Sequence, residues 1–437
     1  MNVPNVKDVL QKLRFLKSNT ALLVPIVIAL VAIVLFIPNQ LVSSKLERQI
    51  EQQSIATARR LRSESNNVAS PKQLQQETQQ LEELARDANQ IAELARQTTQ
   101  RELLSYEIFP EPNETSAFIF DEFGRAFRAS IDNLLSGINS RDCPTEAELE
   151  RSLQRSPLSS RRGRSSISMR SMRSFLAGGT LGGYGRAGRL TSTIVDEVCR
   201  ERAKSAGIYA DPSEISGYDF WGAYEYTGVK KAVEDCWYWQ LGYWVTADVI
   251  DTIAQVNSGS RSVFTSPIKR LVNLGFSLTA GTARRPARFG RRVRKKTEAD
   301  TPAYVLSVTE GLAEPCTGRY CDENLDVIHF RFAVVINSDG VMPFIQELCS
   351  AKDHTFKGYL REQPARTFKH NQITVLEMDV RSVDRETPAH YLYRYGEEAA
   401  VELDLICEYA FNRAGYEEIK PEAIKTKLKG EAQTGTR

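Results

Sequence analysis

Histidine and cysteine are scarce in this sequence. Its 437 residues include four histidines, all beyond residue 328, and seven cysteines, an odd number that leaves at least one thiol outside any pair within the chain. Seven cysteines are too few for a disulfide-stapled scaffold, and four clustered histidines give little material for metal or His-based catalysis across the chain. We therefore expect no catalytic residue, no bound metal and no cofactor.

Several catalytic motifs are also missing. The sequence contains no GxxxxGK[ST] phosphate loop, no HExxH and no GxSxG nucleophile elbow. Gly183, Gly185 and Gly188 do spell GxGxxG, but the strand that a dinucleotide-binding turn requires does not precede them. Three histidines and three aspartates lie in the same region beyond residue 350, but no nucleophile stands at a recognisable spacing from them. These residues are His354, His370 and His390, with Asp353, Asp379 and Asp384. The sequence thus favours a protein that is not an enzyme.

Charge is balanced overall but unevenly distributed. The chain has 57 Lys and Arg against 55 Asp and Glu. Residues 151–192 are rich in Arg, Ser and Gly and predict a disordered loop, and residues 281–300 predict a basic insertion. Such segments can bind nucleic acid or another anionic polymer, although a solvated loop needs no ligand. The basic tract of the insertion consists of Arg284, Arg285, Arg288, Arg291, Arg292, Arg294, Lys295 and Lys296.

An apolar run without a charged residue occupies positions 21–37. At about 1.5 Å per residue, such a helix approaches the thickness of the hydrocarbon layer. The run is longer than a usual signal-peptide core and no A-x-A site follows it, which favours an uncleaved anchor over a signal peptide. Four basic residues between 7 and 17 precede it, so the positive-inside rule places residues 1–20 in the cytoplasm. We predict a transmembrane helix at 21–38 in a single-pass inner-membrane protein whose bulk is periplasmic.

Residues 41–109 predict a helical stalk. From Leu74 to Thr98 the seam positions step by three and four residues, the heptad spacing of a coiled coil. The repeat is short and imperfect, so an amphipathic helix packed on its own domain is the other interpretation. A coiled coil would make the protein a homo- or heterodimer, associated through Leu81, Leu84, Ala88, Ile91 and Ala95.

Beyond the stalk the hydrophobic pattern predicts an α+β fold. An amphipathic helical segment at 113–150 precedes the loop, and 193–310 predicts helices and two strands around the basic insertion. Residues 326–412 alternate apolar and polar side chains in strand, helix and strand segments, with one polar sheet face. This order predicts a C-terminal ferredoxin-like α/β sandwich, followed by a tail at 413–437.

Cys316 and Cys321 lie close together in the sequence, before His329. Structural zinc needs four ligands, and no CxxC or second histidine nearby completes such a set. A disulfide in an oxidising compartment is the favoured interpretation, ahead of two free thiols and of a metal site.

The order of basic tip, single span, helical stalk and terminal sandwich resembles the PilO-like inner-membrane scaffold of type IV pilus machines and its GspM-like relative in type II secretion. The resemblance is carried by residues 7–17, 21–37 and 41–104, and by VIHFRFAVVINSDGVMPFIQELC at 327–349. It implies a non-enzymatic scaffold that pairs with a similar bitopic membrane protein and links a cytoplasmic motor platform to periplasmic partners. The alternative function is a membrane-tethered protein that holds an anionic polymer through its Arg-rich loops; nucleic acid is not the expected partner.

Overall fold

The computed structural model describes residues 25, 28–29, 31–32, 45–48, 56–66, 71–155, 186–278, 300–306 and 317–434. The chain divides into two compact units, 1–89 and 90–437, which we describe separately. Helix α3 (Ala56–Asn66) belongs to the first unit, and α4 (Pro71–Thr98) begins there. Every side chain described in the first unit is exposed.

The prediction of a transmembrane helix at 21–38 is wrong. A span needs about 20 consecutive helical residues of apolar character, and none of the helices in the described ranges combines that length with that character. Of the predicted span only positions 25, 28, 29, 31 and 32 are described, and the others lie outside the described residues, as do positions 1–20. The predicted single-pass inner-membrane location, with a periplasmic bulk, is corrected together with the span on which it depended.

One mixed sheet organises the second unit. Its two parallel pairs join β1 to β2 and β2 to β3, whereas β3, β4, β8 and β7 are antiparallel neighbours. The spatial order is β1 (Ser140–Arg141), β2 (Ile208–Tyr209), β3 (Ile268–Gly275), β4 (Leu325–Asn337), β8 (Ala400–Asn412) and β7 (Ile373–Ser382). A separate antiparallel pair, here called the β5–β6 hairpin, consists of β5 (Lys352–Phe356) and β6 (Arg366–His370).

The prediction of an α+β fold is confirmed, but the ferredoxin-like sandwich is wrong. Such a sandwich is built as βαββαβ within one sheet, whereas here the strand that follows helix α11 (Val341–Leu348) leaves the main sheet and pairs only within the β5–β6 hairpin. In addition, β3 of the predicted 193–310 segment pairs with β4 of the predicted 326–412 segment. These two segments therefore share one sheet.

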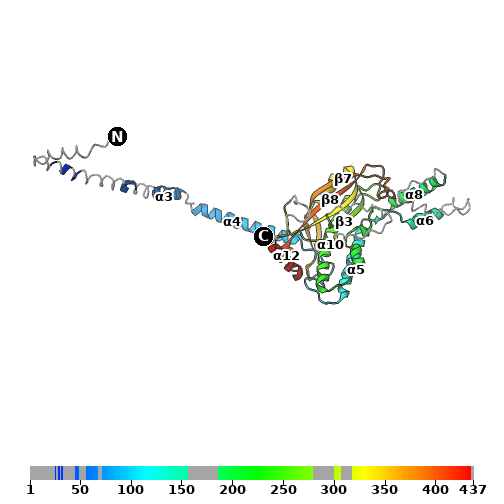
Figure 1. The fold of residues 1–437 in the computed structure, drawn as a ribbon, viewed down its shortest axis with the longest axis horizontal. Helices are drawn as coiled ribbons and strands as arrows, with labels where there is room; N and C mark the ends of the chain where they lie inside the picture. The colour runs from blue at the N-terminus through cyan, green and yellow to red at the C-terminus, as the bar shows by residue number, and fades with distance from the viewer. Residues whose placement is uncertain are drawn as a thin grey trace, which may run out of the picture. The chain divides into compact units, whose positions relative to one another are not determined.

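The central helix is α10 (Val229–Val256), and it lies against the sheet with α5 (Ala117–Gly137) beside it (Figure 1). Its side chains Trp237, Trp239 and Trp244 are almost completely buried. The ring of Trp239 packs edge-on against Phe127 of α5, with the centroids 5.8 Å apart. The alternating residues of β4, such as Phe330, close the core from the sheet side. Each large apolar side chain buried in this way contributes about 1.5–3 kcal/mol.

The remaining helices are short or lie around this core. They are α6 (Glu146–Arg155), α8 (Arg186–Ser205), α9 (Tyr218–Gly222) and α12 (Glu422–Thr434), with the 3-10 turns η3 (Pro212–Glu214), η4 (Ser338–Gly340) and η5 (Arg413–Gly415). Helix α6 starts with a capping box in which the Glu148 N–H donates to the Thr145 hydroxyl and the Thr145 N–H donates to the Glu148 carboxylate. Residues 151–155 and 186–192 of the predicted 151–192 loop are therefore helical, as parts of α6 and α8. Residues 156–185 lie outside the described part.

Candidate association surface

Helix α4 exposes a row of large aliphatic side chains. The exposed fractions are 59% for Leu74, 66% for Leu81, 63% for Leu84, 66% for Ile91 and 63% for Leu94. Single exposed apolar side chains are common on proteins, but a regular series of them along one helix is typical of a contact surface.

The structure places the predicted association residues on one continuous helix. Because α4 runs unbroken from Pro71 to Thr98, the steps of three and four residues between Leu81, Leu84, Ala88 and Ile91 put these side chains on one face. Ala88 is exposed as well, and Ala95 is half-buried. We call this face, from Leu74 to Ala95, the α4 seam.

The positions that flank the α4 seam carry little charge. In the heptad set by the seam, Thr78, Ala85 and Ala92 flank one side, and Gln80, Asp87 and Leu94 flank the other. The charged side chains Glu82, Glu83, Arg86 and Glu93 fall on the outer positions. Like charges beside a seam repel an identical helix. Beside the α4 seam only Asp87 is charged, and within the seam only Glu77, between Leu74 and Leu81, is charged.

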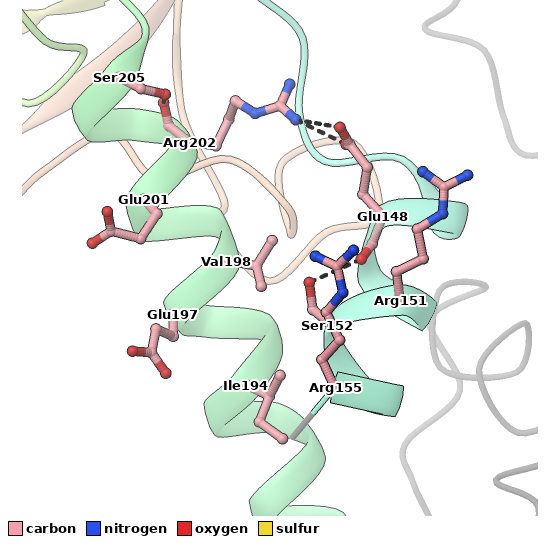
Figure 2. A pocket seen from close by; sticks show the side chains of 10 residues that line it. All are labelled: Glu148, Arg151, Ser152, Arg155, Ile194, Glu197, Val198, Glu201, Arg202 and Ser205. Atoms are coloured by element: carbon pink, nitrogen blue, oxygen red, sulfur yellow. Dashed lines mark hydrogen bonds and ion pairs between the residues drawn. The ribbon is translucent and has the colours of Figure 1, made fainter. Parts of the chain in front are cut away.

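A hollow of about 830 Å³ lies between α6 and α8 (Figure 2). Arg202 of α8 reaches across to Glu148 of α6, and its Nη2 donates to both carboxylate oxygens at 2.8 Å. The Thr145 backbone N–H, assisted by Arg202, lowers the pKa of the Glu148 carboxyl. The hydroxyl of Ser152 donates to the Glu148 carbonyl oxygen at 2.9 Å. The hollow is therefore a helix–helix groove with an internal ion pair, and it holds no activated nucleophile.

A second hollow, of about 500 Å³, lies on the polar face of the sheet. Arg331 of β4 donates through Nε to Asp404 of β8 at 2.7 Å, and Arg381 pairs with Asp379 on β7. The first pair joins two neighbouring strands and the second lies within β7, so these charges are already neutralised by one another. This hollow also offers no arrangement typical of a catalytic site.

A buried ionic network near the C-terminal end of α4 was not predicted. Arg101 binds Asp248 of α10 through two hydrogen bonds, from Nη2 to Oδ1 at 2.8 Å and from Nη1 to Oδ2 at 3.1 Å. His370 Nε2 and the Tyr409 hydroxyl donate to the same Oδ2 at 2.8 and 2.6 Å. These four side chains are at least nine-tenths buried. We call the set the Asp248 network.

Electrostatics in the Asp248 network are governed by burial and by the ion pair. Burial alone would raise the pKa of the Asp248 carboxyl, but Arg101 and His370 outweigh it and hold that pKa well below its usual range. Burial would also lower the pKa of Arg101, and Asp248 reverses this effect. The network therefore contains a fully ionised pair, which stabilises the fold only while both partners are present.

The Asp248 network has few signs in the sequence. His354 and His370 lie near Asp353, Asp379 and Asp384 in the sequence, yet the carboxylate that His370 contacts is Asp248, more than a hundred positions earlier. The one local signal is a carboxylate at position 248, on a helix whose other inward positions are mostly apolar. A charge among such residues indicates a buried partner.

The other predicted site residues are only partly described. Cys321 accepts a hydrogen bond at Sγ from the Val327 N–H at 3.1 Å, and burial raises the pKa of its thiol to about 12. Cys316 and the whole basic tract 284–296 lie outside the described residues, so the disulfide and the polymer-binding role stay predictions. Among the side chains that are described, no group of three His, Cys, Asp or Glu could hold a metal ion.

Comparison with family models, curated proteins and solved structures gave no match for this chain. No relative therefore supports the predicted place in pilus assembly or secretion, and the membrane-spanning helix that the resemblance required was not found among the described residues. That part of the sequence prediction is corrected.

Proposed function

We propose that the protein is a non-enzymatic scaffold that associates with a second copy of itself through the α4 seam. The observation that carries this proposal is the exposed heptad series on α4, with Leu81, Leu84 and Ile91 each about two-thirds exposed. An isolated helix in water gains nothing from holding such side chains on one face, whereas a second helix with the same spacing buries them.

A second copy fits the α4 seam because the large and small apolar side chains of one helix can pack against the same positions of the other. Leu81, Leu84 and Ile91 supply large layers, and Ala88 and Ala95 let the helices approach closely between and beyond them. The flanking positions carry only one charge, that of Asp87, so repulsion between two identical helices is confined to that position and to the Glu77 layer of the seam.

The energetics require several layers to act together. Burying a leucine or isoleucine side chain contributes about 1.5–3 kcal/mol, while association costs about 4–15 kcal/mol in lost freedom of motion. The four large side chains of the seam in each copy exceed this cost only as a set. Disruption of two central layers is therefore expected to abolish association.

Sedimentation of the full chain tests the proposal. The variant Leu84→Asp with Ile91→Asp places charges in two apolar layers and should convert a self-associated protein into a monomer. The matched control, Gln79→Asp with Gln90→Asp, adds the same charge on the same helix at outer positions and should sediment like the wild type. A wild type that stays monomeric at every concentration, or a control that dissociates as fully as the seam variant, would contradict the proposal.

A further inference from the structure

Two histidines of the β5–β6 hairpin touch through identical ring nitrogens. The Nδ1 atoms of His354 and His370 lie 2.9 Å apart. The far nitrogen of each ring faces an oxygen: His370 Nε2 lies 2.8 Å from Asp248 Oδ2, and His354 Nε2 lies 3.1 Å from the Gln100 carbonyl oxygen. We call these two rings the histidine pair.

Counting hydrogens on the histidine pair fixes its protonation. A carbonyl oxygen and an ionised carboxylate only accept, so both Nε2 atoms must carry a hydrogen. The Nδ1–Nδ1 contact also needs one hydrogen, because two lone pairs repel at this distance and two N–H groups would collide. All three contacts are satisfied together only when the pair holds three ring protons, one more than two neutral rings carry.

The two rings of the pair have different surroundings. Burial, with the nearby charges of Arg101 and His370, lowers the pKa of the His354 imidazole to about 4. The His370 ring is the one in contact with the Asp248 carboxylate, with Nε2 2.8 Å from Oδ2. Three other titratable groups surround the pair. The Tyr409 hydroxyl of β8 is hydrogen-bonded to Asp248. Asp251 of α10 and Lys352 of β5 interact electrostatically with Asp248 and with each other.

The histidine pair connects parts of the molecule that share no strand pairing. The β5–β6 hairpin forms its own two-stranded sheet, apart from the main sheet. His354 joins this hairpin to the Gln100 backbone, two residues beyond the end of α4, and His370 joins it to Asp248 of α10. Both bonds belong to one proton-sharing unit.

We propose that the histidine pair is a proton-operated clasp, which fastens the β5–β6 hairpin to the segment following α4 and to α10 when it holds three ring protons. Loss of the shared proton to water leaves one of the three contacts without its hydrogen and opens the clasp. Gain of a fourth proton places an N–H group on each Nδ1 atom, and these two groups repel each other next to the charge of Arg101. The clasp therefore also opens when the pH is lowered.

Hydrogen exchange and histidine NMR on the full chain test the clasp together. The sequence contains only four histidines, so selective ¹⁵N labelling of the imidazole rings gives few signals. Three of the four ring nitrogens of the pair should be protonated when the clasp is closed. Loss of a hydrogen bond to a charged group should then lower the protection of the hairpin amides about tenfold, after correction for intrinsic exchange, as pH rises from about 6 to about 8.5.

The variant His354→Phe keeps a ring but removes the shared proton, and its hairpin protection should no longer vary with pH. The control His329→Phe changes a buried histidine whose two ring nitrogens have no hydrogen-bond partner, and it should retain the wild-type dependence. If His354→Phe does not fold, the measurement on the wild type is sufficient to test the proposal. Hairpin protection that is independent of pH in the wild type, or two ring protons in place of three throughout the range, would overturn the clasp.

Discussion

Arg101 and Asp248 are separated by 147 positions in the sequence, yet their side chains form a two-point ion pair in the interior. Arg101 lies just after α4, and Asp248 lies in the second half of α10. The pair therefore attaches the segment that follows α4 to the central helix of the fold. Because both charges are buried, neither is well solvated without the other.

Removal of one partner should be strongly destabilising. Asp248→Asn leaves the Arg101 guanidinium buried without a counter-charge, and this should lower the free energy of unfolding by about 3–5 kcal/mol. The matched variant Asp379→Asn breaks an exposed pair with Arg381 and should cost about 1 kcal/mol or less. Urea unfolding of the two variants measures the difference. Equal losses would show that burial of the pair is not the deciding factor.

Two glycines of α5 offer a second matched comparison. A Cβ at Gly124 would lie 2.6 Å from Cε3 of the buried Trp221 ring, whereas a Cβ at Gly137 meets nothing within 4 Å. Gly124→Ala should therefore destabilise the protein by about 1–3 kcal/mol through overpacking. Gly137→Ala should be neutral or stabilise it by up to about 1 kcal/mol, because it restricts the unfolded chain. Thermal unfolding checks both, and a Gly124→Ala variant as stable as the wild type would contradict the packing of α5 against α9.

The lowered pKa of His354 predicts a loss of stability in mild acid. Between its ordinary value of 6.5 and its folded value of about 4, the unfolded state binds a proton that the folded state does not. The contribution of the lowered His354 pKa to stability should therefore be fully present above pH 6.5 and decline as pH falls towards 4, separately from the loss of the shared proton at higher pH. Denaturant unfolding at a series of pH values should show a shallower decline for His354→Phe than for the wild type. An identical slope in both proteins would mean that His354 does not titrate differently on folding.

The sequence predicted the elements that depend on local pattern. Alternation of apolar and polar residues within 326–412 correctly predicted the strands β4 and β8, because this two-residue period is a local property of a strand. The sheet order was missed, because strand partners are chosen by contacts distant in the sequence. Of the two strands predicted within 193–310, β3 is present, whereas the described residues 300–306 form only an isolated bridge between Tyr304 and Ile328.

The α4 seam and the Asp248 network differ in the same way in how far the sequence predicts them. The α4 seam was predictable, since Leu81, Leu84 and Ile91 belong to one helix and their spacing alone places them on one face. The Asp248 network was not, because its members come from α10, β6, β8 and the segment after α4. No local pattern links these positions.

Cysteine scanning along α4 tests association through the seam most directly. Single cysteines are placed in turn at positions 81 to 91 of the full chain, and disulfide-linked dimers are measured after mild oxidation against the wild type with its native cysteines. Association through α4 predicts that the yield follows the heptad, with maxima at Leu81, Leu84, Ala88 and Ile91 and minima at outer positions such as Glu83 and Arg86. A yield that is flat along the helix, or never above the wild-type level, would contradict it.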